Sequence, residues 1–429
     1  MRRLICVAVA LSVLWAAATA APVLAQTFSS GSTGADGALN PTTNTTLTLP
    51  ANGVFNFTTV TVPVGVIVRF TRNAANTPVT LLATGNVTIA GTLDLSATSG
   101  GGAVVGTFLG SNAGIGGPGG FDGGNGANGV AATIGGTGLG PGGGGPGTGA
   151  GFATTGGVVS ATGMPGLAYG NAELLPLIGG SGGGGGSAGL GSTSAGGGGG
   201  GGAILIASSG TITLTGTINA RGGSGGGGND PGGGGSGGAI RLVATSIAGV
   251  NGLLDVRGGS GNSGIGIGSG GGSVGRLRLE AYANTATINV NGVAPSVALP
   301  SAVALANGPT LTITSIGGVA TPAAPTASLN TPDVTLPASV TNPVTVTVAG
   351  TNIPAGTPIV ITVNGQTGGI TSVAATLSGT TGSTTATAAV TIPSNRPSVV
   401  SASATFTLAT TAGAAPDVVH VSTVSGLPR

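Results

Sequence analysis

The stretch Gly196 to Gly228, GGGGGGGAILIASSGTITLTGTINARGGSGGGG, contains a glycine run, an apolar segment, a threonine-alternating segment and a turn that leads into more glycine. The same order returns 36 residues later, so that Ala203 and Arg221 correspond to Ala239 and Arg257. A fixed period of strand-like units separated by turn residues is the signature of a solenoid. The repeat therefore predicts stacked coils, each built from the same strands.

Alternation along each segment predicts which side chains point into the stack. Ile204 and Ile206 correspond to Ile240 and Leu242, and these positions are expected to face inward. Arg241 stands between two of them and is expected to point outward. Coils stacked about 4.8 Å apart would pair their backbones and enclose a narrow apolar interior. This pattern predicts a right-handed parallel β-helix with long glycine-rich loops at one corner.

Alternation also occurs upstream, in VFNFTTVTVPVGVIVRF from Val54 to Phe70. We expect residues 54–319 to form the β-helix, with the repeats at 203–295 and with the upstream aromatic residues covering its open end. Residues 26–53 are rich in Gly, Ser, Thr and Asn and are expected to form an exposed leader.

Residues 100–202 form a long glycine-rich insertion, and two physical states are open for it. A flexible loop is the default for such a chain in water, because ordering glycine costs the most conformational entropy. The alternative is a set of extended polyproline-II-like segments, packed closely because glycine has no side chain. Composition favours the flexible loop.

The glycine content falls after Asn291, and a Pro/Ala linker is expected at 320–326. Residues 327–412 contain short alternating segments between Pro, Asn and Gly turns, which predict an immunoglobulin-like β-sandwich. The Cys pair and the Trp of true immunoglobulin domains are absent from it. Residues 413–429 are expected to form a short tail. The chain as a whole is predicted to be all-β.

Residues 1–25 have the features of a secretory signal peptide, with a basic start, an apolar centre and small residues before the cleavage site. Cleavage is expected after Ala25, or otherwise after Ala20. No later apolar run reaches the roughly 18 residues that a transmembrane helix requires. The sequence therefore predicts a secreted chain, extracellular or at the cell surface, without a transmembrane segment after the signal is removed.

The predicted cleavage changes the charge balance. Arg2 and Arg3 are two of the 11 basic residues, so nine basic residues face nine acidic ones in the remaining chain. A neutral chain without Lys lacks the basic patch that nucleic acid or anionic lipid requires. The single Cys, Cys6, lies within the signal, so no disulfide is expected.

The segments PVTLLATGNVTIAGTLDLSA (Pro78–Ala97) and GGGGSGGAIRLVA (Gly232–Ala244) resemble those of glycine-rich secreted proteins of bacteria. The resemblance covers roughly residues 50–295, and the β-helices concerned are similar in outline to adhesin and haemagglutinin stalks. The C-terminal module is similar to the sandwich domains appended to bacterial surface proteins. The resemblance implies a structural or adhesive function, and no catalytic residue can be transferred from it.

Carboxylates on the outer face are the first candidates for chemistry, because many β-helices cleave glycans with several Asp residues and a basic residue. Asp94 and Asp255 are predicted to occupy one outward position, which Asn219 and Asn289 fill in other coils. One interpretation is a carboxylate ladder. The other, which we favour, is an Asn/Asp stack that pairs side-chain amides and closes turns.

Arginines form the second candidate set. Arg221 and Arg257 each precede a Gly pair, where a ladder of guanidinium groups would bind an acidic glycan. The alternative is that these residues aid solubility and are partly neutralised by Asp255. The candidate exterior ladder therefore comprises Asp94, Arg221, Arg241, Asp255 and Arg257.

Other signals are weaker. Threonine alternation at 211–217 and 310–314 is compatible with a flat ice- or glycan-binding face, although Thr also favours strands in general. His420 has no nucleophile elbow near it, and the glycine runs match neither calcium nonapeptides nor phosphate loops. No cofactor or metal is predicted.

The sequence thus favours a non-enzymatic, exported structural or adhesive scaffold, with a glycan or another surface protein as partner. A carbohydrate-binding or polysaccharide-degrading β-helix protein is the alternative. An ice-binding surface is the lesser alternative.

Overall fold

The computed structural model describes residues 26–427 except 74, 105–109, 130–133, 160–162, 190, 265–267, 304–308, 323–324, 326–331, 366–369, 394–396 and 409–416. The described residues are all-β, as predicted, with both parallel and antiparallel sheets. They contain no helix, and so none that is long and apolar enough to cross a membrane. The predicted signal peptide lies outside the described residues.

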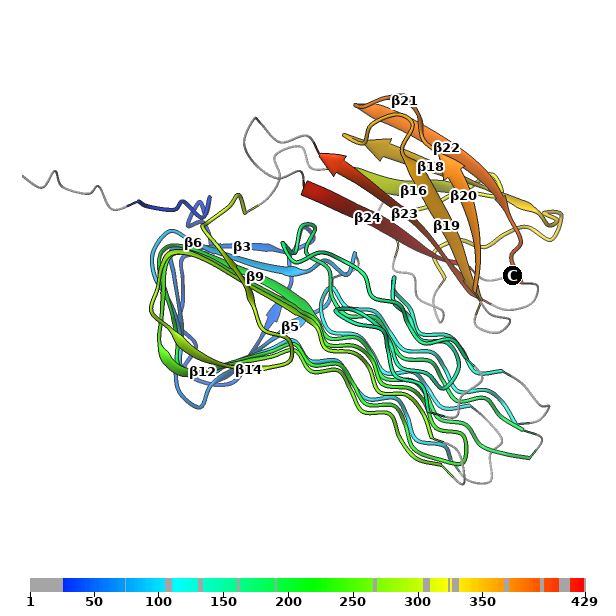
Figure 1. Cartoon of the computed structure of the whole chain (residues 1–429), viewed down its shortest axis with the longest axis horizontal. Helices are drawn as coiled ribbons and strands as arrows, with labels where there is room; N and C mark the ends of the chain where they lie inside the picture. The colour runs from blue at the N-terminus through cyan, green and yellow to red at the C-terminus, as the bar shows by residue number, and fades with distance from the viewer. Residues whose placement is uncertain are drawn as a thin grey trace, which may run out of the picture.

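Two parallel sheets face each other in the first part of the chain (Figure 1). The nine-stranded sheet has the order β1-β4-β7-β9-β11-β13-β15, with β3 and β6 beside this path. The six-stranded sheet has the order β14-β12-β10-β8-β5-β2. The strands are β1 (Ala38–Leu39), β2 (Thr45–Thr48), β3 (Val54–Phe57), β4 (Thr59–Val62), β5 (Ile67–Thr71), β6 (Val79–Ala83), β7 (Val87–Ile89), β8 (Thr92–Asp94), β9 (Ala203–Leu214), β10 (Thr217–Asn219), β11 (Ala239–Ala248), β12 (Val250–Asp255), β13 (Arg276–Asn284), β14 (Thr287–Asn291) and β15 (Ser296–Ala298).

The strand register reproduces the 36-residue repeat. Ala203 pairs with Ala239 in the nine-stranded sheet, and Thr217 pairs with Leu253 in the six-stranded sheet. The inward residues of both sheets, among them Ile204 and Ile240, meet in one apolar core and are fully buried. Burial of this core between stacked strands is the main favourable term for this part of the chain.

One correspondence in the last coil differs from the prediction. Asn289 was expected to match Asp255, but Asp255 pairs with Asn291. The register shifts between Val250 and Gly252, and the residue between them, Asn251, has a positive φ of 61°. A left-handed residue that inserts into one strand forms a β-bulge, and Asn tolerates this conformation better than most residues do.

Most residues of 26–53 are exposed or partly exposed, as predicted, but the segment is part of the parallel sheets and not a separate leader. Residues 38–39 and 45–48 form β1 and β2, which pair with β4 and β5. Nearer the N-terminus, the Ser30 hydroxyl donates a hydrogen bond of 2.7 Å to the carbonyl of Ala83, and the Phe28 N–H donates to Thr245 Oγ1 at 2.9 Å. These polar segments form their backbone hydrogen bonds with the two parallel sheets, which together we call the stack. Composition alone does not show this pairing.

The described residues of the glycine-rich insertion form packed segments, so the favoured interpretation of a flexible loop is wrong for them. Its last segment, Gly196–Gly202, is buried, and we call it the central segment because other segments surround it. Gly196, Gly199 and Gly202 donate hydrogen bonds of 2.9, 3.1 and 2.9 Å to one neighbouring segment. The other N–H and C=O groups of the central segment bond to further neighbours. The segments around it are residues 95–101, 112–117, 118–124, 180–186, 220–226 and 232–239.

Hydrogen bonds to the same neighbour recur every three residues, which is the period of polyproline II. A polyproline-II segment makes no hydrogen bonds within itself, so all its backbone groups are available to adjacent segments. Such close approach requires glycine: a Cβ at Gly200 would lie under 3.0 Å from backbone atoms of Gly180 and Ser181. We call these packed segments between residues 95 and 275 the glycine bundle.

The C-terminal part has two antiparallel sheets, of order β17-β16-β18-β22-β21 and β20-β19-β23-β24, with an apolar core between them. Val399 of the four-stranded sheet contacts Leu139 of the glycine bundle, with Phe121 packed against both. The strands are β16 (Thr310–Ile316), β17 (Val319–Ala320), β18 (Val344–Thr351), β19 (Pro358–Gly365), β20 (Ile370–Thr376), β21 (Ser378–Thr380), β22 (Ser383–Val390), β23 (Ser398–Leu408) and β24 (Asp417–Leu427).

Both ends of this C-terminal part differ from the predicted boundaries of 327 and 412. β16 precedes the expected linker at 320–326, yet it pairs with β18 because its Leu311 and Ile313 are buried in the antiparallel core. The expected tail contains β24, which pairs along its length with β23.

Candidate functional site

The outward position that contains Asp94 and Asp255 forms a continuous line across the six-stranded sheet. The strand register places Arg69, Asp94, Asn219, Asp255 and Asn291 side by side on β5, β8, β10, β12 and β14. We call these five residues the polar row. Asn291 takes the place predicted for Asn289, because the bulge in β12 shifts the register of the last coil.

Three of the four neighbouring pairs in the polar row are joined by side-chain contacts. Arg69 Nε lies 3.1 Å from Asp94 Oδ2, and Asn219 Nδ2 donates to Asp94 Oδ1 at 3.2 Å. Asn291 Nδ2 donates to Asp255 Oδ2 at 3.4 Å. The row is thus tied across the strands by its side chains as well as by the backbone ladder.

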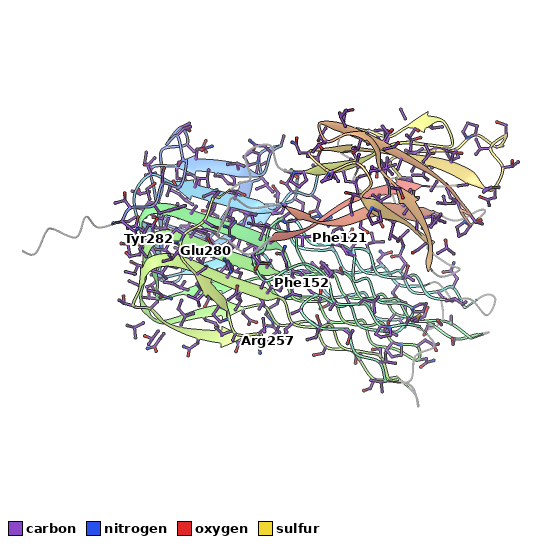
Figure 2. The ribbon with its side chains drawn as sticks, turned by 45° about the horizontal axis from the view of Figure 1, so that its top comes forward. Phe121, Phe152, Arg257, Glu280 and Tyr282 are labelled. Carbon is purple, nitrogen blue, oxygen red and sulfur yellow. The ribbon has the colours of Figure 1, made fainter. Side chains whose placement is uncertain are left out.

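Asp255 is the most enclosed carboxylate of the polar row. Arg257 donates to both of its oxygens, at 3.0 Å from Nε and 2.7 Å from Nη2, and Arg221 Nε lies 3.9 Å away. Burial raises the pKa of Asp255, but the hydrogen bonds from Arg257 and Asn291 outweigh it and hold the pKa below its ordinary value. Asp255 is therefore ionised at neutral pH, and Figure 2 labels the exposed Arg257 beside it.

The polar row also closes the same turn after three strands of the six-stranded sheet. The Arg221 N–H donates to Asn219 Oδ1 and the Arg257 N–H donates to Asp255 Oδ1, both at 3.2 Å. The Ser96 N–H donates to Asp94 Oδ1 at the same distance. A side chain that accepts from the N–H two residues on forms an Asx turn, which here directs the chain from β8, β10 and β12 into the glycine bundle.

This geometry does not supply a catalytic pair. Asp94 and Asp255 are separated by one strand, which places their backbones roughly 9–10 Å apart, a spacing that inverting glycosidases also use. Such enzymes need one carboxyl group with a raised pKa as the general acid, whereas the pKa of Asp255 is lowered and Asp94 is ion-paired with Arg69. In the described part of the chain, no group of three or more His, Cys, Asp or Glu is placed to hold a metal.

Arg241 does not belong to this line, and its predicted exposure is wrong. It lies in the nine-stranded sheet, and its side chain is only 1% exposed. It points away from the main core, as predicted, but residues 301 and 302 lie over it: Arg241 Nη2 donates to Ser301 Oγ at 2.7 Å and to the Ala302 carbonyl at 3.2 Å.

Glu280 is the partner of Arg241 and was not identified from the sequence. Arg241 Nε and Arg278 Nε lie 2.8 and 2.9 Å from Glu280 Oε1. The N–H and hydroxyl of Ser301 donate to Oε2 at 2.8 and 2.6 Å. Arg278 and Glu280 are two residues apart on one strand, so their side chains lie on the same outward face. This spacing was the signal in the sequence that could have shown their ion pair. Figure 2 labels Glu280 in the stack.

The environment of Glu280 keeps its charged form. Burial raises the pKa of Glu280. The hydrogen bonds from Arg241, Ser301 and Arg278, together with the charge of Arg241, lower this pKa by more than burial raises it, so the net pKa is below the ordinary value. The result is an Arg–Glu–Arg group in which Arg241 and Glu280 are enclosed and Arg278 is 13% exposed, and it fixes residues 301–302 onto the sheet. This location indicates a structural role.

An aromatic cluster anchors the glycine bundle to β13. The Phe152 and Tyr169 rings stack with centroids 4.5 Å apart, and the Arg276 guanidinium lies 5.7 Å from the Phe152 centroid. The Tyr169 hydroxyl donates to the Gly179 carbonyl at 2.6 Å and accepts from Ser181 at 3.0 Å. Burial raises the pKa of Tyr169, so the phenol stays neutral and keeps its proton for this hydrogen bond.

The predicted threonine face is divided among three sheets. Thr213 lies in register with Thr88 and Thr61 on the nine-stranded parallel sheet, where Thr211 also hydrogen bonds to Ser246 at 2.7 Å. Thr217 lies in the six-stranded sheet, and residues 310–314 lie in the five-stranded antiparallel sheet. Of the predicted threonines, Thr213 forms a regular column, with Thr61 and Thr88, which the prediction did not include.

No family model matches the chain, and neither the curated proteins nor the solved structures contain a match. The function is therefore inferred from the chain's own geometry. Three features enter that inference: the glycine bundle, the polar row with its turns, and the column of Thr61, Thr88 and Thr213. The side chain of His420 lies outside the described residues.

Proposed function

We propose that this chain is a non-enzymatic, exported structural or adhesive scaffold of the bacterial cell surface or extracellular matrix. In this proposal the two parallel sheets are coils of a right-handed parallel β-helix, and the two antiparallel sheets are an immunoglobulin-like sandwich. The alternation of strands between the two parallel sheets along the chain supports the first assignment. The apolar core between the two antiparallel sheets supports the second.

The observation that carries the proposal is the glycine bundle. Its segments are joined by backbone hydrogen bonds to neighbours on several sides, and their buried glycines leave no room for side chains between them. A backbone lattice of this kind fills its own interior with main chain, and it extends the coils into a broad, stiff body. Such a body suits a spacer that holds an attached domain in position.

The polar row supports the same proposal, because its carboxylates already form ion pairs within the chain. Asp94 is paired with Arg69, and Asp255 is paired with Arg257 and Arg221. These contacts close turns and tie coils together. Polysaccharide cleavage or recognition of an acidic glycan by this row would require these pairs to open first.

Ice binding is a second candidate, supported by the column Thr61, Thr88 and Thr213. Its members are uncharged, partly exposed, and repeat at the strand spacing of about 4.8 Å. An ordered array of hydroxyl and methyl groups is the kind of surface that can hold a regular layer of water.

A polysaccharide assay tests the proposal against its enzymatic alternative. Residues 26–429 are incubated with a panel of acidic and neutral polysaccharides, and newly released reducing ends are measured beside a D94N/D255N double variant. We expect no release from either protein above the level of buffer alone. Release by the wild type that the double variant loses would contradict the proposal. Enrichment of the wild type in a slowly growing ice fraction would favour the second candidate.

A further inference from the structure

The last coil of the parallel stack ends in two edge strands, β14 and β15. The inward residues of β14, Ile288 and Val290, pack against the core but are only partly buried. Large apolar side chains nearby face solvent, with Val297 65% and Leu299 66% exposed. Others at this end are Val250, Tyr282 and Val293. The core is therefore open here, and we call this surface the C-terminal end of the stack.

The edge strand β14 lacks two of the features that usually protect a sheet edge, and the one bulge described near it lies in the neighbouring β12, at Asn251. Edge strands are normally guarded by charged side chains, by Pro or by bulges, because their unpaired backbone groups invite another strand. β14, Thr287–Asn291, contains neither a charged residue nor Pro. The sequence from 281 to 309 contains no charged residue at all. Figure 1 shows β12 and β14 on the side of the stack away from the antiparallel sheets.

The opposite end of the stack is closed differently. The Asp36 N–H donates to the Asn56 carbonyl at 2.9 Å, and the Thr58 N–H donates to the Gly37 carbonyl at 2.7 Å, so residues 36 and 37 occupy the edge of β3. Phe55 stacks on Phe57, with ring centroids 5.5 Å apart, beneath this edge. Because this end is partly covered, a head-to-tail filament would have to displace its cap.

We propose that the C-terminal end of the stack is the interface with a second copy of this chain, related by a two-fold axis, with β14 antiparallel to its counterpart. The strand is self-complementary in this arrangement. Pairing about Asn289 sets Ile288 opposite Val290 and Thr287 opposite Asn291. Residues directly opposite in an antiparallel pair point to the same face, so both apolar residues continue the core while both polar ones stay outside.

An identical copy is the partner that this surface fits. Its matching end is uncharged, so no like charges meet, and its own open core needs the same cover. A two-fold interface of this kind closes on itself and produces a dimer, whereas a head-to-tail contact would produce an open chain.

The test is the mass of residues 26–429 in solution, measured by sedimentation equilibrium over a wide concentration range. Asn289→Lys is the informative variant: Asn289 is exposed, and the two-fold axis would place each Lys against its own counterpart. Thr385→Lys, on the outer face of the five-stranded sheet, is the matched control. We expect dimers for the wild type and T385K, and at least a tenfold weaker association for N289K.

A monomeric wild type at every concentration would overturn the proposal. So would assemblies that grow beyond two chains, because those require a head-to-tail contact. Dimers that persist unchanged in N289K would show that another surface forms the interface.

Discussion

Gly200→Ala is expected to destabilise the parallel part of the chain by about 3 kcal/mol or more, the upper range for an overpacked interior. The new methyl group would lie under 3.0 Å from the carbonyl carbon and oxygen of Gly180 and from the Ser181 nitrogen. These are backbone atoms held by hydrogen bonds to other segments, so no flexible side chain can move aside. Denaturant titration of the purified variant measures the loss.

Gly189→Ala is the matched control in the same glycine-rich insertion. Gly189 is exposed, its nearest neighbour to an added Cβ is Ser192 Oγ at 3.8 Å, and its φ is not positive. We expect this variant to be as stable as the wild type, or more stable by about 0.4–1 kcal/mol, since Ala lowers the entropy of the unfolded chain. Equal stability of the two variants would mean that the glycine segments are not packed.

Glu280→Gln is expected to cost about 3–5 kcal/mol, the usual loss when one partner of a buried ion pair is removed. The substitution keeps the shape but leaves Arg241, whose side chain is only 1% exposed, without its counter-charge. Asp94→Asn removes a carboxylate of the same ion-pair type from a setting where its partner, Arg69, is 50% exposed. That control is expected to cost at most about 1 kcal/mol. Equal losses would contradict the role assigned to Glu280.

The same group gives the stack a defined response to acid. The pKa of Glu280 is lowered in the folded protein, so its contribution to stability is fully present above the pKa of an unfolded Glu. It is lost as the pH falls from there through the lowered folded value. Asp255 acts in the same direction, because its pKa is also lowered. The difference in unfolding free energy between wild type and E280Q should therefore shrink below about pH 4.

The strands of the repeat could be predicted because their pattern is local and recurs. The pairing of Ala203 with Ala239 and of Thr217 with Leu253 follows from a period visible in the sequence. The last coil was misaligned because Asn251 inserts one residue by adopting a positive φ, and a single Asn gives no warning of this.

The segments that cover the outward face of a sheet could not be predicted from this local pattern. Arg241 was expected in solvent because alternation reports direction and not what lies beyond the sheet. Its cover, Ser301 and Ala302, comes from 60 and 61 residues further along the chain. The members of the polar row were largely identified, but their mutual contacts and the turns they close depend on the exact register of the coils.

The largest error was the prediction that the glycine runs form a flexible loop, and this error has a physical reason. The entropy cost of ordering glycine is local and visible in the composition, whereas its compensation comes from hydrogen bonds to segments far apart in sequence. Gly183 donates to Gly198, and Gly198 donates to Gly233, each at 2.9 Å. No single run can form this lattice, and the two parallel sheets bring the runs together.

Amide hydrogen exchange across Gly196–Gly202 tests the central claim most directly. Every N–H in this segment donates to a backbone carbonyl of another segment, and the segment is buried. The packed glycine bundle predicts that these amides exchange as slowly as those of β9 and β11 in the core. Exchange at the rate of an unstructured chain, with β9 and β11 still protected, would contradict it.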